Sequence, residues 1–262
     1  MAAARAGRVR RAAHAEWTKL RTLRSTGWLL LGLIVATVVV GALTAAGAPD
    51  CRPSARCVED TTRDSLTGVR LGQIAVVLLA VSMLGGEYGT GLIRTTLTVF
   101  PRRLALLAVK ATVLAGVVAA VGTIAVVGSL GVGRLILADK GYPGPSPTDG
   151  ATLRAAAGTV LYLVLIAWSA LGVGAALRDS VGVMTVLLAL LYIAPVLVRA
   201  IADPDWQRRL ARVTPMTAGL AIQATRELGG LPIGPWPGMA VLAGYAATAL
   251  LVGGGRFVRG DA

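Results

Sequence analysis

The distribution of apolar residues constrains this chain more than any other feature, because about six long apolar stretches are separated by short charged segments. Apolar residues make up 55% of its 262 residues and charged residues only 15%. A soluble domain carries roughly 25% charged residues, since its surface faces water. The mean hydropathy of +0.71 instead indicates a surface that faces lipid, with no stretch left over for a soluble catalytic domain.

The apolar stretches are long enough to cross a membrane. A hydrocarbon core of ~30 Å is spanned by about 20 helical residues. We therefore predict an all-α polytopic membrane protein, a single domain over residues 1–262 with six transmembrane helices. The predicted spans are 28–46, 69–86, 104–130, 153–177, 181–198 and 237–252. The third is long enough to tilt or to continue past the membrane, the last is short, and Pro195 should kink the fifth.

Positive charge predicts the orientation of these spans. One set of connecting segments (1–27, 87–103, 178–180 and 253–262) holds 13 Lys and Arg residues, and the longer set (47–68, 131–152 and 199–236) holds 10. The positive-inside rule places the denser set, and with it both termini, in the cytoplasm. The net charge of +13 sits beside apolar spans, which favours an anionic membrane face over nucleic acid as its partner.

The two cysteines agree with this orientation. Cys51 and Cys57 both lie in the first predicted external segment, where an oxidising compartment would permit a local disulfide. Two free thiols in a flexible loop are the alternative. A metal site is disfavoured, because the only histidine, His14, lies on the opposite side.

The sequence lacks the residues of several catalytic and transport mechanisms. None of the three lysines, Lys19, Lys110 and Lys140, stands in the Gly-Lys-Ser/Thr context of a nucleotide-binding P-loop. No predicted span contains Asp or Glu, which disfavours a proton-coupled carrier. We therefore predict that this chain is not an enzyme. Arg70, Lys110 and Arg154 stand near span ends, where we expect their side chains to reach the headgroups. A substrate or pathway role is the alternative for Lys110, which lies about two turns into the third span.

The segment before the first span combines aromatic and basic residues. If residues 14–26 form a helix, Trp17 and Leu20 share an apolar face that Glu16 and Arg24 interrupt. A tryptophan ring beside cations suits the headgroup layer. We predict an interfacial helix with the characteristic residues Glu16, Trp17, Lys19, Arg21 and Arg24. An ordinary basic flank without a helix is the alternative.

The segment between the second and third spans, residues 87–103, is short and polar. Glu87 and Arg94 are seven residues apart and would share a helical face, and Pro101 ends any helix there. A compact polar hairpin between two membrane helices is suited to dock another protein. A simple connecting loop is the alternative.

Both segments carry recognisable patterns. The first reads Glu16-Trp17-x-Lys19-Leu20-Arg21-x-x-Arg24, and the second reads Glu87-Tyr88-x-x-Gly91-x-Ile93-Arg94-x-x-Leu97 followed by Pro101-Arg102-Arg103. Together with the six-span layout and the length, they resemble the permease subunits of type-2 ATP-binding cassette exporters. The 47–68 segment with its two cysteines departs from the family pattern.

The resemblance implies roles for these segments. Residues 14–26 would be an elbow helix on the inner membrane face, and residues 87–100 a coupling helix that fits a cleft on the nucleotide-binding subunit. The positions that match the family in the coupling helix are Glu87, Tyr88, Gly91 and Arg94. The 199–236 segment would be an external loop containing short helices.

The resemblance also implies a function. Two permease subunits, identical or paired with a sister, would form one pathway across a bacterial cell membrane. A separate ATPase would bind ATP and Mg²⁺, and this chain would hold no cofactor. The uncharged spans suit an apolar or amphipathic cargo such as a drug, a peptide antibiotic or a lipid. A non-transporting membrane scaffold or sensor and an ATP-independent secondary carrier are the alternatives.

Overall fold

A computed structural model describes residues 2–51, 59–89, 103–146 and 148–259 of the chain. Every regular element among these residues is helical, which confirms the all-α class. The elements are α1 (Ala2–Thr22), α2 (Arg24–Gly47), α3 (Thr61–Ser65), α4 (Val69–Gly89), α6 (Arg103–Asp139), α7 (Gly150–Leu177), α8 (Ser180–Leu188), the π-helix η1 (Ala189–Ile193), α9 (Ala194–Arg199), α10 (Pro204–Val213), α11 (Pro215–Leu220), the 3₁₀ turns η2 (Ala221–Gln223) and η3 (Leu228–Gly230), and α12 (Pro235–Arg259).

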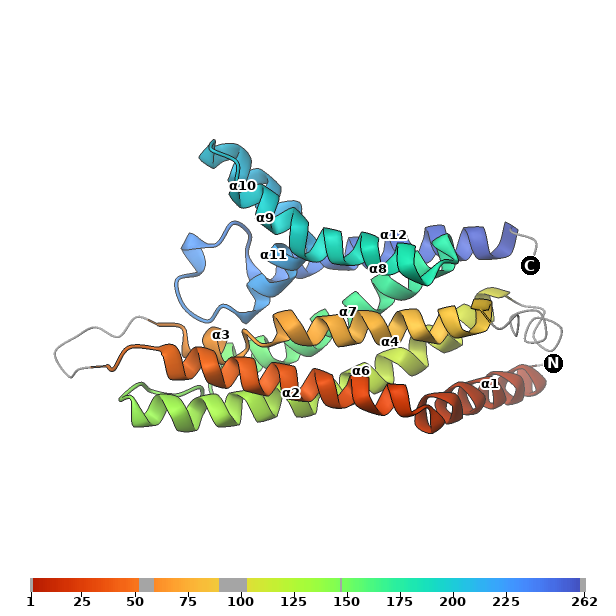
Figure 1. Cartoon of the computed structure of the whole chain (residues 1–262), viewed down its shortest axis with the longest axis horizontal. Helices are drawn as coiled ribbons and strands as arrows, with labels where there is room; N and C mark the ends of the chain where they lie inside the picture. The colour runs from red at the N-terminus through yellow and green to blue at the C-terminus, as the bar shows by residue number, and fades with distance from the viewer. Residues whose placement is uncertain (1, 52–58, 90–102, 147, 260–262) are drawn as a thin grey trace.

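The long helices lie side by side along the longest axis of the molecule (Figure 1). Both termini lie at the end of the bundle where α4 ends and α6 begins, and α3 and α10 lie at the opposite end. We call these the terminal end and the α3 end. The arrangement brings α1 and the last turn of α4 to the same end.

Among the described residues, five helices are long and apolar enough to cross a membrane: Arg24–Gly47, Leu104–Asp139, Gly150–Leu177, Ser180–Arg199 and Pro235–Val258. The apolar part of α4, Val69–Leu84, is shorter. By length and composition, the chain is therefore a multi-pass membrane protein of helices.

Two helices extend well beyond their predicted spans. α6 continues to Asp139, past the predicted end at residue 130, and its 37 residues make it about 55 Å long. α12 continues to Arg259, past the predicted end at residue 252. Hydropathy marks the part of a helix that suits lipid, whereas the helix itself ends where its backbone hydrogen bonds end.

Pro195 changes the helix type just before it. The predicted fifth span is divided into α8, the π-helix η1 and α9, and Pro195 is the second residue of α9. A proline within a helix removes one backbone donor and its ring crowds the carbonyl four residues earlier. The wider π turn before Pro195 accommodates both effects.

α7 occupies the centre of the bundle, in contact with α4, α6, α8 and α12. It meets α12 at two glycines. A Cβ added to Gly172 would lie 2.4 Å from the carbonyl carbon of Ala249, and one added to Gly253 would lie 2.2 Å from the carbonyl oxygen of Gly172. The two backbones therefore approach as closely as only small residues allow.

A buried polar network joins the middle of the bundle. Gln73 of α4 and Tyr162 of α7 are both 0% exposed. The Tyr162 hydroxyl donates to Gln73 Oε1, and Gln73 Nε2 donates to the Tyr192 hydroxyl of η1 at 3.0 Å. Buried polar groups without water need such partners, so the network fixes α4, α7 and η1 relative to one another.

Candidate functional site

Two of the four predicted coupling residues belong to an element at the terminal end. Glu87 and Tyr88 belong to the last turn of α4, where the backbone is described and their side chains are not. Gly91 and Arg94 lie outside the described residues. The proposed contact with an ATPase therefore stays a prediction, located at the end of α4.

The predicted elbow helix is longer than residues 14–26. α1 runs over Ala2–Thr22, and the chain bends at Leu23, whose extended backbone (ψ 116°) precedes α2. Residues 24–26 therefore belong to the first long apolar helix. The bend lets α1 leave the direction of α2 at the terminal end (Figure 1).

The buried face of α1 differs from the predicted one. Glu16 is 4% exposed and Leu20 6%, whereas Trp17 is 50% exposed. The predicted apolar stripe through Trp17 is therefore not the face that packs on the bundle. The remaining predicted elbow residues, all exposed, are Lys19, Arg21 and Arg24.

Glu16 is buried because it meets a lysine of α6. Lys110 Nζ lies 2.9 Å from Glu16 Oε1, and the two side chains are 1% and 5% exposed. Lys19 Nζ lies 3.5 Å from the same oxygen and is 47% exposed. The expectation that Lys110 reaches the headgroups is wrong, because a carboxylate inside the bundle binds it instead. The ion pair joins α1 to α6.

An open groove of about 460 Å³ follows the bend between α1 and α2. Trp17, Arg21 and Arg24 line one side, and Gly116 and Val117 of α6 line the other. The structure thus brings three of the predicted elbow residues together at one surface. An indole ring and two guanidinium groups beside an apolar wall suit the headgroup layer of a membrane.

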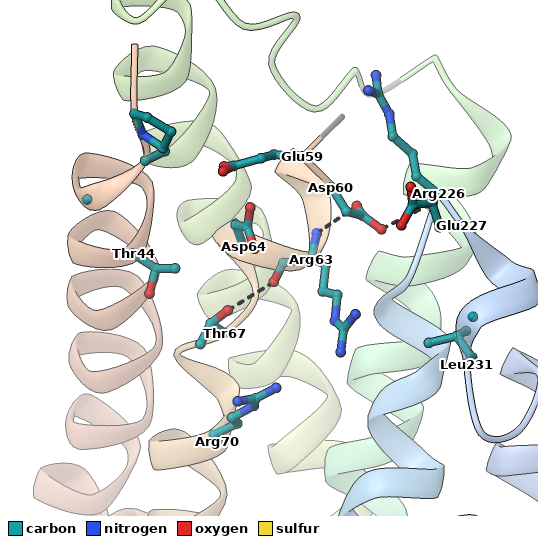
Figure 2. Close-up of a pocket in the computed structure, with 14 residues that line it drawn as sticks. Thr44, Glu59, Asp60, Arg63, Asp64, Thr67, Arg70, Arg226, Glu227 and Leu231 are labelled. Carbon is teal, nitrogen blue, oxygen red and sulfur yellow. Dashed lines mark hydrogen bonds between the residues drawn. The ribbon is translucent and has the colours of Figure 1, made fainter. Parts of the chain in front are cut away.

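A cavity of about 660 Å³ opens at the α3 end (Figure 2). α2, α3, the start of α4 and the loop after η2 form its walls. Its charged and hydroxyl-bearing residues are Thr44, Glu59, Asp60, Arg63, Asp64, Thr67, Arg70, Arg226 and Glu227. Opposite charges therefore line one open space.

Asp60 holds two walls of this cavity together. Its carboxylate caps α3 by accepting from the Arg63 backbone N–H at 3.1 Å. It also accepts from the backbone N–H and the hydroxyl of Thr225, both at 2.6 Å, and from the Arg226 backbone N–H at 3.0 Å. One short loop is thereby fixed against α3, although 165 residues separate Asp60 from Thr225.

Two further side chains position the same loop. Arg154 of α7 donates to the Ala224 carbonyl at 2.6 Å, so it binds protein at a place where we expected it to reach the headgroups. Gln223 donates to the Leu66 carbonyl at 3.4 Å and to the Thr159 hydroxyl at 3.3 Å. The cavity wall after η2 is thus built by contacts with α7 and with the residue that follows α3.

The acidic side of the cavity disfavours ionisation of Asp64. The pKa of Asp64 is raised above its ordinary value, first by burial and then by the neighbouring carboxylates of Glu59 and Asp60, while Arg63 opposes the shift. A cation placed beside these carboxylates would relieve their repulsion. The cavity can therefore accept positive charge on this side.

One of the two cysteines of the predicted disulfide lies at the same end. Cys51 follows α2, and its backbone N–H donates to the Lys140 carbonyl at 2.9 Å. Cys57 lies outside the described residues, so the pairing of Cys51 with Cys57 stays a prediction. Among the described residues, no group of three or more His, Cys, Asp or Glu side chains could hold a metal ion.

Sequence reasoning missed both the ion pair and the cavity. A signal for the ion pair was present, since Glu16 interrupts an apolar stripe and Lys110 interrupts an apolar span. The sequence carried a weaker signal for the cavity, because the residues that line it come from two segments more than 150 positions apart. No model of a known protein family matches the chain, and no curated protein sequence is significantly similar to it.

Proposed function

We propose that this chain is the membrane-spanning permease subunit of an ATP-binding cassette exporter in a bacterial cell membrane. Six transmembrane helices with both ends in the cytoplasm form half of a pathway, and a second copy or a sister subunit supplies the rest. A separate ATPase hydrolyses ATP with Mg²⁺. The cargo is an apolar or amphipathic molecule.

The ion pair between α1 and α6 carries this proposal. It lies at the terminal end, where α4 ends and where the predicted coupling residues 87–94 begin. An ATPase that pushes on this segment would displace the start of α6, and Lys110 would transmit the displacement to α1 through Glu16. Such a contact changes the equilibrium between two conformations only if the ATPase binds one of them more tightly.

The architecture supports the proposal in a second way. The long helices leave no described segment that could form an ATPase domain, and the sequence contains no P-loop lysine. Energy for transport would then come from a partner chain. A scaffold would share the helix bundle but would not need a rigid connection between the elbow helix and the third span.

Purification of the tagged full chain from native membranes tests the proposal. We expect a P-loop ATPase to co-purify in stoichiometric amounts and to be identified by mass spectrometry. Glu87→Ala and Arg94→Ala should each weaken its binding by about tenfold, equivalent to about 1.4 kcal/mol for one lost charged contact.

Matched controls exist at the opposite end. Asp205 and Arg208 of α10 form an exposed ion pair, with side chains 76% and 65% exposed. Asp205→Ala and Arg208→Ala remove the same types of charge and should leave ATPase binding unchanged. Intact chain that carries no ATPase would refute the exporter proposal and favour a scaffold or a secondary carrier.

A further inference from the structure

Two arginines in the cavity at the α3 end have no described ionic partner. Arg63 extends from α3, and Arg70 is the second residue of α4. Neither forms an ion pair with any described residue. The buried Nε of Arg70 also has no hydrogen-bond partner among the described residues. A guanidinium with buried donors binds an anion strongly, because charge-assisted bonds replace the lost contacts with water.

The carboxylates of the cavity lie in a different part of it. In Figure 2, Glu59 and Asp64 lie nearer the end of the molecule, and the guanidinium groups of Arg63 and Arg70 lie deeper. Asp60 is already occupied by backbone donors of the neighbouring loop. On this wall the carboxylates of Glu59 and Asp64 therefore lie further out than the guanidinium groups of Arg63 and Arg70, while the guanidinium of Arg226 lies near the outer end on the opposite wall.

This order of charges matches one kind of ligand. In a phospholipid with an amine headgroup, the phosphate lies nearest the acyl chains and the ammonium group extends further out. The cavity lies where α2 ends and α4 begins, beside two apolar helices of a membrane protein. A phosphate at the depth of Arg70 would therefore place its ammonium group near Glu59 and Asp64.

The size of the cavity agrees with such a ligand. A volume of about 660 Å³ is within the ~300–1,000 Å³ typical of small-molecule sites. Thr44 and Thr67 add hydroxyl groups to the wall, and Leu231 adds an apolar surface.

We propose that this cavity binds a phosphoethanolamine headgroup, with the phosphate at Arg63 and Arg70 and the primary ammonium at Glu59 and Asp64. The proposal stands whether or not the chain is an exporter subunit, because it concerns binding alone. A primary ammonium can donate hydrogen bonds to both carboxylates, whereas the quaternary ammonium of choline has no donor.

Native mass spectrometry of the full chain in detergent, titrated with dioleoyl phospholipids, tests the proposal. We expect saturable binding of phosphatidylethanolamine that is about tenfold tighter than binding of phosphatidylcholine or phosphatidylglycerol, the effect of one charged contact. Asp64→Asn should remove this preference, because it deletes a carboxylate that binds the ammonium. Arg70→Gln should instead weaken the binding of all three lipids, because each of them carries the phosphate. Arg63→Gln and Glu59→Gln provide a second pair if the first pair fails to fold.

Competition with water-soluble glycerophosphoethanolamine distinguishes the source of the ligand. Displacement of the lipid shows that the headgroup alone is recognised, and retention of the lipid shows that the acyl chains contribute. Both outcomes support the site.

Charge-matched controls come from α10. Arg208→Gln and Asp205→Asn alter an exposed ion pair outside the cavity and should leave lipid binding unchanged. Equal binding of phosphatidylglycerol and phosphatidylethanolamine would overturn the proposal. Cavity variants that bind lipid like the α10 controls would also overturn it.

Discussion

The two ends of the helix bundle place opposite charges in different surroundings. At the terminal end, Glu16 and Lys110 are almost fully buried and lie 2.9 Å apart. At the α3 end, Arg63 and Arg70 line an open cavity and form no ion pair with a described residue. Burial makes an unpaired charge very costly, so the pair Glu16–Lys110 fixes α1 against α6. Charges at an open cavity remain able to bind a ligand.

Removal of Lys110 should have the largest effect on stability, because it eliminates the buried ion pair of the terminal end. Lys110→Met leaves Glu16 buried without its nearest partner, and we expect a loss of about 3–5 kcal/mol in the free energy of unfolding. The double variant Glu16→Gln with Lys110→Met should recover most of this loss, because no buried charge remains unpaired. Unfolding of the purified chain by SDS in mixed micelles measures both values.

Lys19→Met is the control for this experiment. Lys19 contacts the same carboxylate at 3.5 Å, but its side chain is 47% exposed. Its removal should cost about 1 kcal/mol or less, as for exposed ion pairs. A Lys110 variant no less stable than the Lys19 variant would show that the buried pair does not hold α1 on α6.

Removal of Asp60 should have the next largest effect, at the α3 end. Asp60→Ala removes the cap of α3 and three hydrogen bonds to residues 225 and 226, and we expect a loss of about 2 kcal/mol. Hydrogen exchange at residues 224–231 should accelerate, because this loop loses its attachment to α3.

Asp203→Ala is the matched variant. Asp203 caps α10 by accepting from the backbone N–H groups of Asp205 and Trp206, a local contact only. Its removal should cost about 1 kcal/mol and leave exchange in residues 224–231 unchanged. Equal exchange in the two variants would show that Asp60 does not position the cavity wall.

The smallest expected effect concerns the pH dependence of stability, which should differ between carboxylates of the α3 end. The pKa of Asp64 is raised by burial and by Glu59 and Asp60, so its stabilising contribution is present below pH 3.8 and is lost as the pH rises through the raised value. Asp64→Asn should therefore be more stable than the native chain at neutral pH, and the difference should vanish in acid.

Asp149 should show the opposite sign. Its pKa is lowered by the Thr152 hydroxyl and by the Ala151 backbone N–H, so its contribution is present above pH 3.8 and is lost as the pH falls through the lowered value. Asp149→Asn should be less stable than the native chain at neutral pH. Thermal aggregation of the detergent-solubilised variants as a function of pH measures both signs. The same sign for both would contradict the assigned surroundings.

Much of the fold could be predicted from local sequence. Six apolar stretches predicted the positions of α2, α4, α6, α7, α8–α9 and α12, and Pro195 marked the change of helix type in the fifth. Pro204, Pro215 and Pro235 stand at the first positions of α10, α11 and α12, a signal that our predictions did not use to place helix starts. These signals are local, since helix formation and transfer into lipid depend on neighbouring residues.

The candidate sites were predicted less completely. Four of the predicted elbow residues lie on α1, and Arg24 is the first residue of α2. The predicted packing face of α1 was wrong, since Glu16 is buried and Trp17 is half exposed. Hydrophobic periodicity assigns carboxylates to a polar surface. It cannot anticipate a lysine 94 residues later that makes burial of the carboxylate favourable.

The sequence by itself determined that this chain is helical, that its surface suits lipid and where its helices lie, because these properties sum over consecutive residues. The tertiary structure alone decided which polar residues meet. The pair Glu16–Lys110, the contact of Asp60 with Thr225 and the cavity around Arg63 and Arg70 each depend on segments distant in sequence. In a low-dielectric interior, a charge is retained only where the fold supplies its partner, and that partner is set by helix packing.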